Sequence, residues 1–222
     1  MRVLHITEVL EAAGIESFIM NVYRNIDRKK VQFDFLVMRD QTEFYDEEIA
    51  KLGGRKYTIS IPVSNTLLRI QLESLQLYRF LKKHKYDVIH IHTTTPLRAP
   101  YLLAAKMANV KTRIYHSHSA EVRGKSKIKL FIYNYYQKKI SKWATDWFAC
   151  SEVAAEWMYE KRLIDRGKVN VVYNGIDTKR FSYNLSARAK IRKQMNLEDA
   201  FVITHTGRFL PQKKSYAYNR CF

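Results

Sequence analysis

The chain has 222 residues, of which 46% are hydrophobic and 13% aromatic, a composition that excludes a disordered protein. Lysine and arginine number 39 against 21 acidic residues, and the resulting formal charge of +18 favours anionic partners: phosphate-bearing ligands, polyanions or an anionic lipid surface. No apolar run approaches the roughly 20 residues of a membrane span. The N-terminal MRVLHITEVL is typical of a strand rather than a signal peptide, so we expect a cytosolic protein.

Apolar segments alternate along the chain with amphipathic ones. The apolar segments predict strands at residues 3–9, 33–37, 57–61, 87–92, 113–116, 147–150, 169–173 and 201–206. The amphipathic segments predict helices at residues 16–25, 42–52, 65–83, 98–108, 125–143 and 152–159. This alternation predicts an α/β fold with a Rossmann-like, doubly wound and mainly parallel sheet, covered on both faces.

The composition changes after this series of elements. We expect residues 1–180 to form one Rossmann-like domain, residues 181–200 to form a polar linker region, and residues 201–222 to begin a second unit. About 20 residues are too few for a second domain, and we therefore expect the chain to be a fragment. The cysteines, Cys150 and Cys221, form no disulfide framework and fit a reducing compartment; we expect Cys150 to be structural.

Small residues and histidines follow the predicted strands. The loop with Gly14 precedes a helix, whose free N–H groups can bind a phosphate or carboxylate, although an ordinary turn has the same pattern. His90 and His92 share one face of a strand, and His116 and His118 end the next strand. Four such histidines suggest zinc, but no cysteine or carboxylate nearby completes a site, so we expect no metal and favour a pocket for a polar ligand. We place His92, His116 and Glu16 in that pocket.

A basic segment precedes residue 143. No acid lies between Glu121 and Asp146, while lysines including Lys125, Lys127 and Lys129 accompany apolar residues at helical spacing. Such a helix can lie on an anionic bilayer, and it can equally be a core helix with a solvated lysine face. No helix-turn-helix, zinc-finger or single-strand-binding pattern is present, so we expect no nucleic acid partner.

Two cations, Arg208 and Lys213, lie in GRFLPQK after the last predicted strand, where a planar fork and a point charge could hold a diphosphate. AAGIESFIMNVYR, YDVIHIH, RIYHSHS, VYNGIDTKRF and GRFLPQK, in this order and spacing, resemble the family 4 retaining glycosyltransferases of the GT-B fold. The most similar members are bacterial enzymes of capsular and exopolysaccharide assembly. The resemblance covers residues 1–214 and implies the N-terminal, acceptor-side half of a GT-B fold.

The resemblance implies an enzyme that transfers a sugar from a nucleotide sugar, a UDP- or GDP-sugar, to a lipid-linked or saccharide acceptor. It requires no metal or cofactor and acts at the inner face of the plasma membrane as a peripheral protein. His118 matches the catalytic histidine that faces the donor sugar, Gly14 the loop near the donor diphosphate or the acceptor, and Arg208 and Lys213 the diphosphate-binding pair. Ala13 replaces the first of two usual glycines.

The family's second domain, with its Glu-x7-Glu pair, has no match in this chain. We therefore expect little or no activity from it alone. The alternatives are a non-catalytic module that binds a glycolipid or a polyanion and, with less support, a nucleic-acid-binding protein. From the topology we also expect His118 and Gly14 on the same edge of the sheet, because parallel strands end together.

Overall fold

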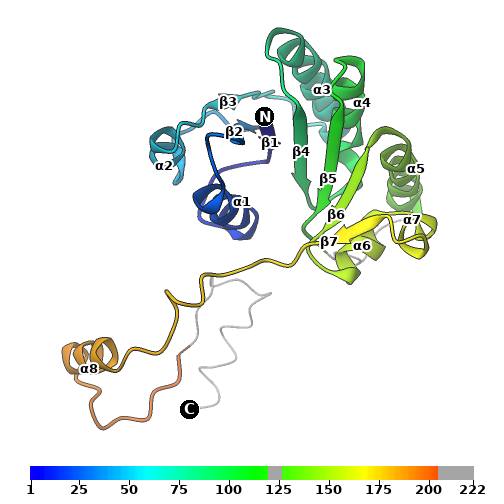
Figure 1. Cartoon of the computed structure of the whole chain (residues 1–222). Helices are drawn as coiled ribbons and strands as arrows, with labels where there is room; N and C mark the ends of the chain where they lie inside the picture. Colours follow the sequence, from blue (N-terminus) through cyan, green and yellow to red (C-terminus); the bar gives the residue numbers. More distant parts are fainter. Residues whose placement is uncertain (120–126, 205–222) are drawn as a thin grey trace. The chain divides into compact units, whose positions relative to one another are not determined.

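The computed structural model describes residues 1–119 and 127–204, and its centre is a parallel sheet (Figure 1). The strands are β1 (Arg2–Ile6), β2 (Gln32–Val37), β3 (Lys56–Thr58), β4 (Val88–Thr93), β5 (Thr112–Ser117), β6 (Asp146–Ala149) and β7 (Val169–Val171). They are hydrogen-bonded in the order β3-β2-β1-β4-β5-β6-β7, and every neighbouring pair is parallel. The predicted doubly wound, Rossmann-like α/β fold is confirmed.

Helices connect the strands. They are α1 (Gly14–Asn25), α2 (Asp46–Lys51), α3 (Thr66–Lys83), η1 (Pro96–Arg98), α4 (Ala99–Met107), α5 (Lys127–Trp143), α6 (Glu152–Met158), α7 (Lys161–Asp165) and α8 (Leu185–Gln194). Helix α2 is shorter than the predicted helix at 42–52, and α7 was not predicted. The strand predicted at 201–206 is not formed by residues 201–204, which pair with no other strand; the remainder of that segment lies outside the described residues.

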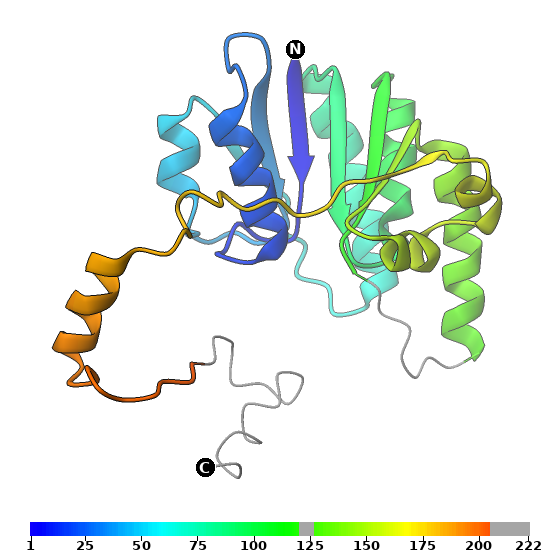
Figure 2. The same ribbon diagram turned by 60° about the horizontal axis from the view of Figure 1, so that its bottom comes forward.

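The two faces of the sheet carry different cores. One face packs against α3, α4, α5 and α6 through a large apolar cluster that includes Ile89, Ile91 and Tyr115. The other face packs against α1 and α2 through a smaller cluster that includes Phe35. Figure 2 shows α1 on one side of the strands and α4 and α5 on the other. Because side chains alternate along a strand, the neighbours of Ile89, Ile91 and Tyr115 point toward α1, and this alternation places the histidines on the α1 face.

Local chemistry fixes where several elements begin and end. Asn65 accepts a hydrogen bond from the N–H of Leu68 at 3.0 Å and so caps the start of α3. Ser151 caps α6 in the same way through the N–H of Ala154, at 3.2 Å. Gly53 adopts a φ of +85° immediately after α2, a conformation that a side chain would strain.

The chain divides into two compact units. The first contains the whole sheet and comprises Met1–Ile176, so it ends slightly before the predicted boundary at residue 180. The second comprises Asp177–Phe222, and its described part contains α8, which lies in the predicted linker region. None of the described helices has the length and apolar character needed to cross a bilayer.

Candidate functional site

A cavity of about 210 Å³ lies at the carboxyl ends of β1 and β4. These strands are neighbours, but the chain continues from β1 toward β2 and from β4 toward β5, in opposite directions along the sheet. Doubly wound sheets bind their ligands at such a switch point. The polar lining comes from the segment after β1, from α1 and α3, and from the end of β4 with the segment after it. It comprises Thr7, Glu8, Glu16, Thr66, Arg69, His92, Thr93, Thr94, Thr95 and Arg98.

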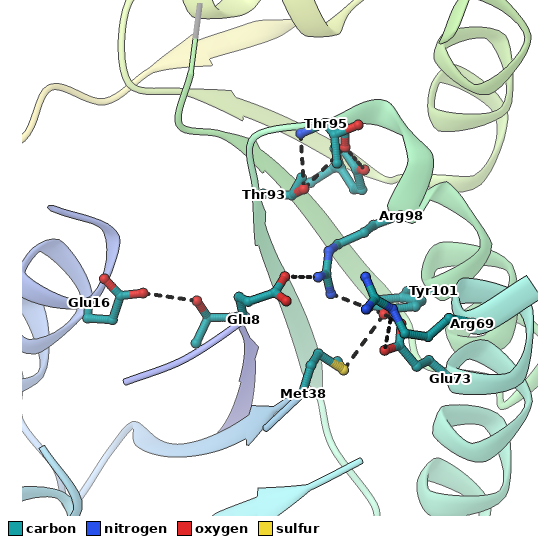
Figure 3. A network of polar contacts seen from close by, with 11 residues as sticks. Glu8, Glu16, Met38, Arg69, Glu73, Thr93, Thr95, Arg98 and Tyr101 are labelled. Atoms are coloured by element: carbon teal, nitrogen blue, oxygen red, sulfur yellow. Dashed lines mark hydrogen bonds and ion pairs between the residues drawn. The ribbon is translucent and has the colours of Figure 1, made fainter. Parts of the chain in front are cut away.

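A buried arginine organises one wall of this cavity (Figure 3). Arg98, at the end of η1, pairs with Glu8 and donates from Nη1 to the Tyr101 hydroxyl at 3.1 Å. The Tyr101 hydroxyl donates in turn to Glu73, which also lies 3.7 Å from the Nε of Arg69. Burial opposes the charge of Arg98, but the nearby Tyr101, Glu8 and Glu73 outweigh it and raise its pKa. Arg98 is therefore a permanent cation whose charge the wall already balances.

Glu16 faces the cavity from the first turn of α1. Its side chain is buried, with 3% exposed, and Thr7 donates to its Oε1 at a long 3.4 Å. The second oxygen, Oε2, is buried and has no hydrogen-bond partner among the described residues. Burial raises the pKa of this carboxyl group. Glu16 is thus a polar group in the cavity wall with hydrogen-bonding capacity that the protein leaves unused.

Five histidine rings cover the α1 face of the sheet beside the cavity. The Nδ1 of His5 lies 2.9 Å from the Nε2 of His92, and the Nδ1 of His92 lies 2.9 Å from the Nε2 of His118. A second pair joins the Nε2 of His90 to the Nδ1 of His116 at 3.1 Å. The register pairs His5 with His90 and His92 with His116. Each hydrogen bond instead runs diagonally, to the histidine two residues further along the neighbouring strand or just after its end.

These rings are neutral at physiological pH. Burial lowers the pKa of His5 to about 3, of His118 to about 4 and of His116 to about 2, with repulsion from other histidines adding to the last. Burial, followed by the charges of neighbouring histidines, also lowers the pKa of His90 and His92 well below the ordinary value. The cluster therefore consists of hydrogen-bonded neutral imidazoles and not of imidazolium cations.

Two histidine triads have ring nitrogens within 4.8 Å of one another and could hold a divalent cation: His5, His90 and His92, and His92, His116 and His118. Two histidine nitrogens bound to one tetrahedral zinc lie about 3.3 Å apart, since each zinc–nitrogen bond is about 2.0–2.1 Å long. The observed separations of 2.9 Å are those of direct hydrogen bonds. The described geometry thus favours ring-to-ring hydrogen bonds.

The predicted pocket residues have different positions. His92 and Glu16 line the cavity. His116 does not: it is completely buried, because Phe18 of α1 covers it with a ring-centroid distance of 5.4 Å, so the prediction that it lines the pocket is wrong. His118 follows β5 directly and is half-buried. Its ring centroid lies 5.8 Å from that of Phe18.

Gly14 lies at the edge of the sheet that the topology predicted, and Cys150 lies against the apolar interior. Gly14 begins α1, about one helical turn before Phe18, and therefore lies at the same edge of the sheet as His118. An added Cβ at Gly14 would meet nothing within 4 Å, so the backbone there is open to an approaching group. Cys150 is a free thiol that packs against the larger apolar core, which agrees with a structural role.

The basic helix α5 has two distinct halves. Its second half packs into the larger core through Ile140, which is completely buried. Its first half projects Ile128 and Phe131 outward, with 73% and 75% of these residues exposed, next to the exposed Lys127 and Lys129. The predicted amphipathic segment is therefore a core helix at one end and an exposed apolar and basic surface at the other.

Three predicted residues, Lys125, Arg208 and Lys213, lie outside the described residues. Sequence reasoning did not identify three residues of the cavity lining, Glu8, Arg69 and Arg98. It also missed Tyr101 and Glu73, which bond to them, and His5. The signal for His5 was available, since it follows Val3 at a two-residue interval on a predicted parallel strand and therefore shares its face. For Arg98 the available signal was its position in the short segment that follows the carboxyl end of β4.

The chain is similar in sequence to known proteins. Residues 12–180 match the model of Glycosyltransferase Family 4. The Bacillus subtilis (strain 168) protein EpsF, whose name describes it as a glycosyltransferase, is 32% identical over 98% of this chain and 56% of its own length. The Escherichia coli UDP-Gal:alpha-D-GlcNAc-diphosphoundecaprenol alpha-1,3-galactosyltransferase is 24% identical over 96% of this chain and 55% of its own.

The fold is also found in solved structures. Anabaena Alr3699/HepE in complex with UDP superposes with a TM-score of 0.71 at 18% identity and covers 97% of this chain and 56% of its own. The same protein in complex with UDP-glucose gives a TM-score of 0.68. This chain thus spans about half the length of the relatives it matches.

Proposed function

Because the chain belongs to glycosyltransferase family 4, we propose that it forms the acceptor-binding side of an enzyme that transfers a sugar from a nucleotide sugar to a lipid-linked or saccharide acceptor in polysaccharide biosynthesis. The observation that carries this proposal is the polar cavity at the switch point of the sheet, with Glu16 in its wall. The Escherichia coli relative is named for a GlcNAc-diphosphoundecaprenol acceptor, which supports a lipid-linked acceptor here.

The charge balance of the cavity favours the sugar part of the acceptor. Arg98 pairs with Glu8 and Arg69 lies near Glu73, so neither cation offers an unbalanced charge to a phosphate. The carboxylate of Glu16 belongs to the cavity lining and is a hydrogen-bond acceptor suited to a sugar hydroxyl, and the threonine hydroxyls nearby can donate or accept. The acceptor's diphosphate would then lie outside the cavity, toward the basic surface of the chain.

The donor in this proposal is a UDP- or GDP-sugar. The names of the relatives support UDP, since one transfers galactose from UDP-Gal and a structural neighbour was crystallised with UDP. His118 would face the donor sugar, Gly14 would lie near the diphosphate or the acceptor, and Arg208 and Lys213 would bind the diphosphate without a metal. Such a site acts by orientation and by electrostatic stabilisation of the leaving diphosphate.

The exposed half of α5 is the proposed contact with a membrane. Ile128 and Phe131 can enter the lipid interface while Lys127 and Lys129 approach anionic headgroups. A peripheral position at the inner face of the plasma membrane would bring the cavity to a lipid-linked acceptor. Nucleic acid has no part in this proposal.

The test is acceptor binding by the 222-residue chain. A GlcNAc-diphosphate with a short alkyl chain is titrated into the protein, and we expect saturable binding that Glu16→Gln weakens about tenfold, because the substitution exchanges an accepting oxygen for a donor. Glu47→Gln is the matched control, since Glu47 is exposed on α2. Binding that Glu16→Gln leaves unchanged would contradict the proposed pocket.

Transfer is measured separately. We expect the chain alone to transfer sugar from UDP-sugars far more slowly than a relative of full length, because it spans about half of such a protein. Acceptor binding that persists in a longer protein with no transfer from any UDP- or GDP-sugar would favour the alternative, a non-catalytic glycolipid-binding module.

A further inference from the structure

Three histidines form a continuous hydrogen-bonded chain from the interior of the sheet to its carboxyl edge. His5 on β1 and His92 on β4 are buried, with 4% and 3% exposed, and His118 after β5 is half-buried. His92 bonds both neighbours, His5 through its Nε2 and His118 through its Nδ1, and both distances are 2.9 Å. His92 therefore uses both ring nitrogens in the chain.

A neutral imidazole has one N–H donor and one bare nitrogen that accepts. If His92 donates from Nδ1 to His118, its Nε2 must accept from His5; if it donates from Nε2 to His5, its Nδ1 must accept from His118. The three hydrogen-bonded histidines therefore have only two arrangements of protons. In the first, all three rings carry hydrogen on Nδ1, and in the second, all three carry it on Nε2. The low pKa values of these rings agree with neutral imidazoles.

The buried end of the row of three histidines, at His5, distinguishes the two arrangements. The Nε2 of His5 is buried and has no hydrogen-bond partner within the part of the chain that the structure describes. The second arrangement would place an N–H there, and buried N–H groups without a partner are rarer in proteins than acceptors without one. The first arrangement leaves only a bare nitrogen at that position.

We propose that His92, supported by His5, is a positioning residue that fixes His118 in the tautomer with hydrogen on Nδ1. His118 then presents a hydrogen-bond donor at the rim of the sheet, and its Nε2 is occupied by His92. An N–H at this position suits an oxygen acceptor, such as a sugar hydroxyl or a phosphate oxygen. The identity of that ligand as the donor sugar rests on the proposed function, whereas the tautomer does not.

The tautomers are measured directly by NMR of the chain with ¹⁵N-labelled histidine, at pH 7.5 in the presence of EDTA, because bare and protonated ring nitrogens have different ¹⁵N shifts. We expect His5, His92 and His118 all to carry hydrogen on Nδ1. Hydrogen on the Nε2 of His118, or a mixture of both forms in the unsubstituted protein, would overturn the proposal.

Two substitutions of His92 test the positioning role. His92→Asn places an amide N–H near the position of the ring Nδ1, and we expect His118 to keep hydrogen on Nδ1. His92→Phe removes the donor, and we expect hydrogen to appear on the Nε2 of His118, the form that free imidazole side chains prefer in water. If His118 has the same tautomer in both variants, His92 does not determine it.

The folding of each variant is checked through His90 and His116. Their mutual hydrogen bond contains no atom of His92, so their signals should persist wherever the sheet is intact. If His92→Phe does not fold, the unsubstituted protein and His92→Asn still decide the outcome. Failure of acceptor or donor binding would contradict the proposed function and leave the tautomer result standing.

Discussion

The histidine cluster predicts that this protein is unusually sensitive to mild acid. Four of its rings, on His5, His90, His92 and His116, are at most 9% exposed, and burial lowers the pKa of each well below its value in an unfolded chain. In the unfolded protein, each ring takes up a proton near pH 6.5. In the folded protein it remains neutral, so the unfolded state binds more protons below that pH.

The sign and the size follow from this difference. Because the pKa of each ring is depressed in the folded protein, the rings cost no stability above pH 6.5. The free energy of unfolding falls progressively as the pH falls below that value. At pH 5.5, one unit lower, each ring costs about 1.4 kcal/mol, and four rings together cost about 6 kcal/mol. Since domains are stable by about 5–15 kcal/mol, this loss is a large fraction of the total free energy of unfolding.

Urea denaturation of the chain between pH 7.5 and 5.5 measures this loss. We expect the free energy of unfolding to fall with a slope that approaches about four protons per molecule near pH 5.5. Replacing both His90 and His116 by leucine removes a hydrogen-bonded pair together and should reduce the slope by about two protons. The matched control is His84→Gln, because His84 lies outside the cluster. A slope below one proton, or one that the double substitution leaves unchanged, would refute the reasoning.

Three further outcomes test separate parts of the structure. Asp34→Asn should destabilise the sheet by about 3 kcal/mol in urea denaturation, because the buried carboxylate accepts hydrogen bonds from Arg2 at 2.6 and 2.8 Å; an unchanged urea midpoint would contradict this. Gly54→Ala should destabilise the protein by about 1–3 kcal/mol, since the added Cβ would lie 2.8 Å from a backbone oxygen. Gly14→Ala should change the stability by less than about 0.5 kcal/mol, because nothing lies within 4 Å of the added Cβ. Equal melting temperatures of the two variants would be inconsistent with that packing. Phe131→Glu should reduce co-sedimentation with anionic liposomes while leaving the melting temperature unchanged, because the side chain is 75% exposed on α5; binding that depends on neither lipid charge nor this residue would exclude the membrane contact.

The fold class was predictable because its signals are local. Short apolar segments rich in β-branched residues alternate with amphipathic ones, and each of the seven strands of the sheet overlaps a segment that the sequence marked. The segment at 201–206 has the same local pattern, but residues 201–204 form no strand, because a strand also needs a hydrogen-bonded neighbour. Local pattern alone does not supply that neighbour.

The site was predictable only in part, because burial of a polar group depends on packing between distant segments. Arg98 and Glu73 have the sequence appearance of charged residues on solvated helix faces, and they become a buried network only when α3 and η1 meet. The strand pattern placed His116 and His118 at the carboxyl end of β5. It could not show that Phe18 covers the first completely and leaves the second at the rim.

The hydrogen-bonded histidine rings also constrain how this sequence can change over generations. Replacing one ring of the His90–His116 pair by an apolar residue leaves its neighbour's nitrogen without a partner in the interior, which costs about 1–3 kcal/mol. Replacing both together removes the unsatisfied group. Substitutions on this face of the sheet should therefore be accepted in pairs, and a lineage that changes one ring first must pass through a less stable protein before the second change restores it.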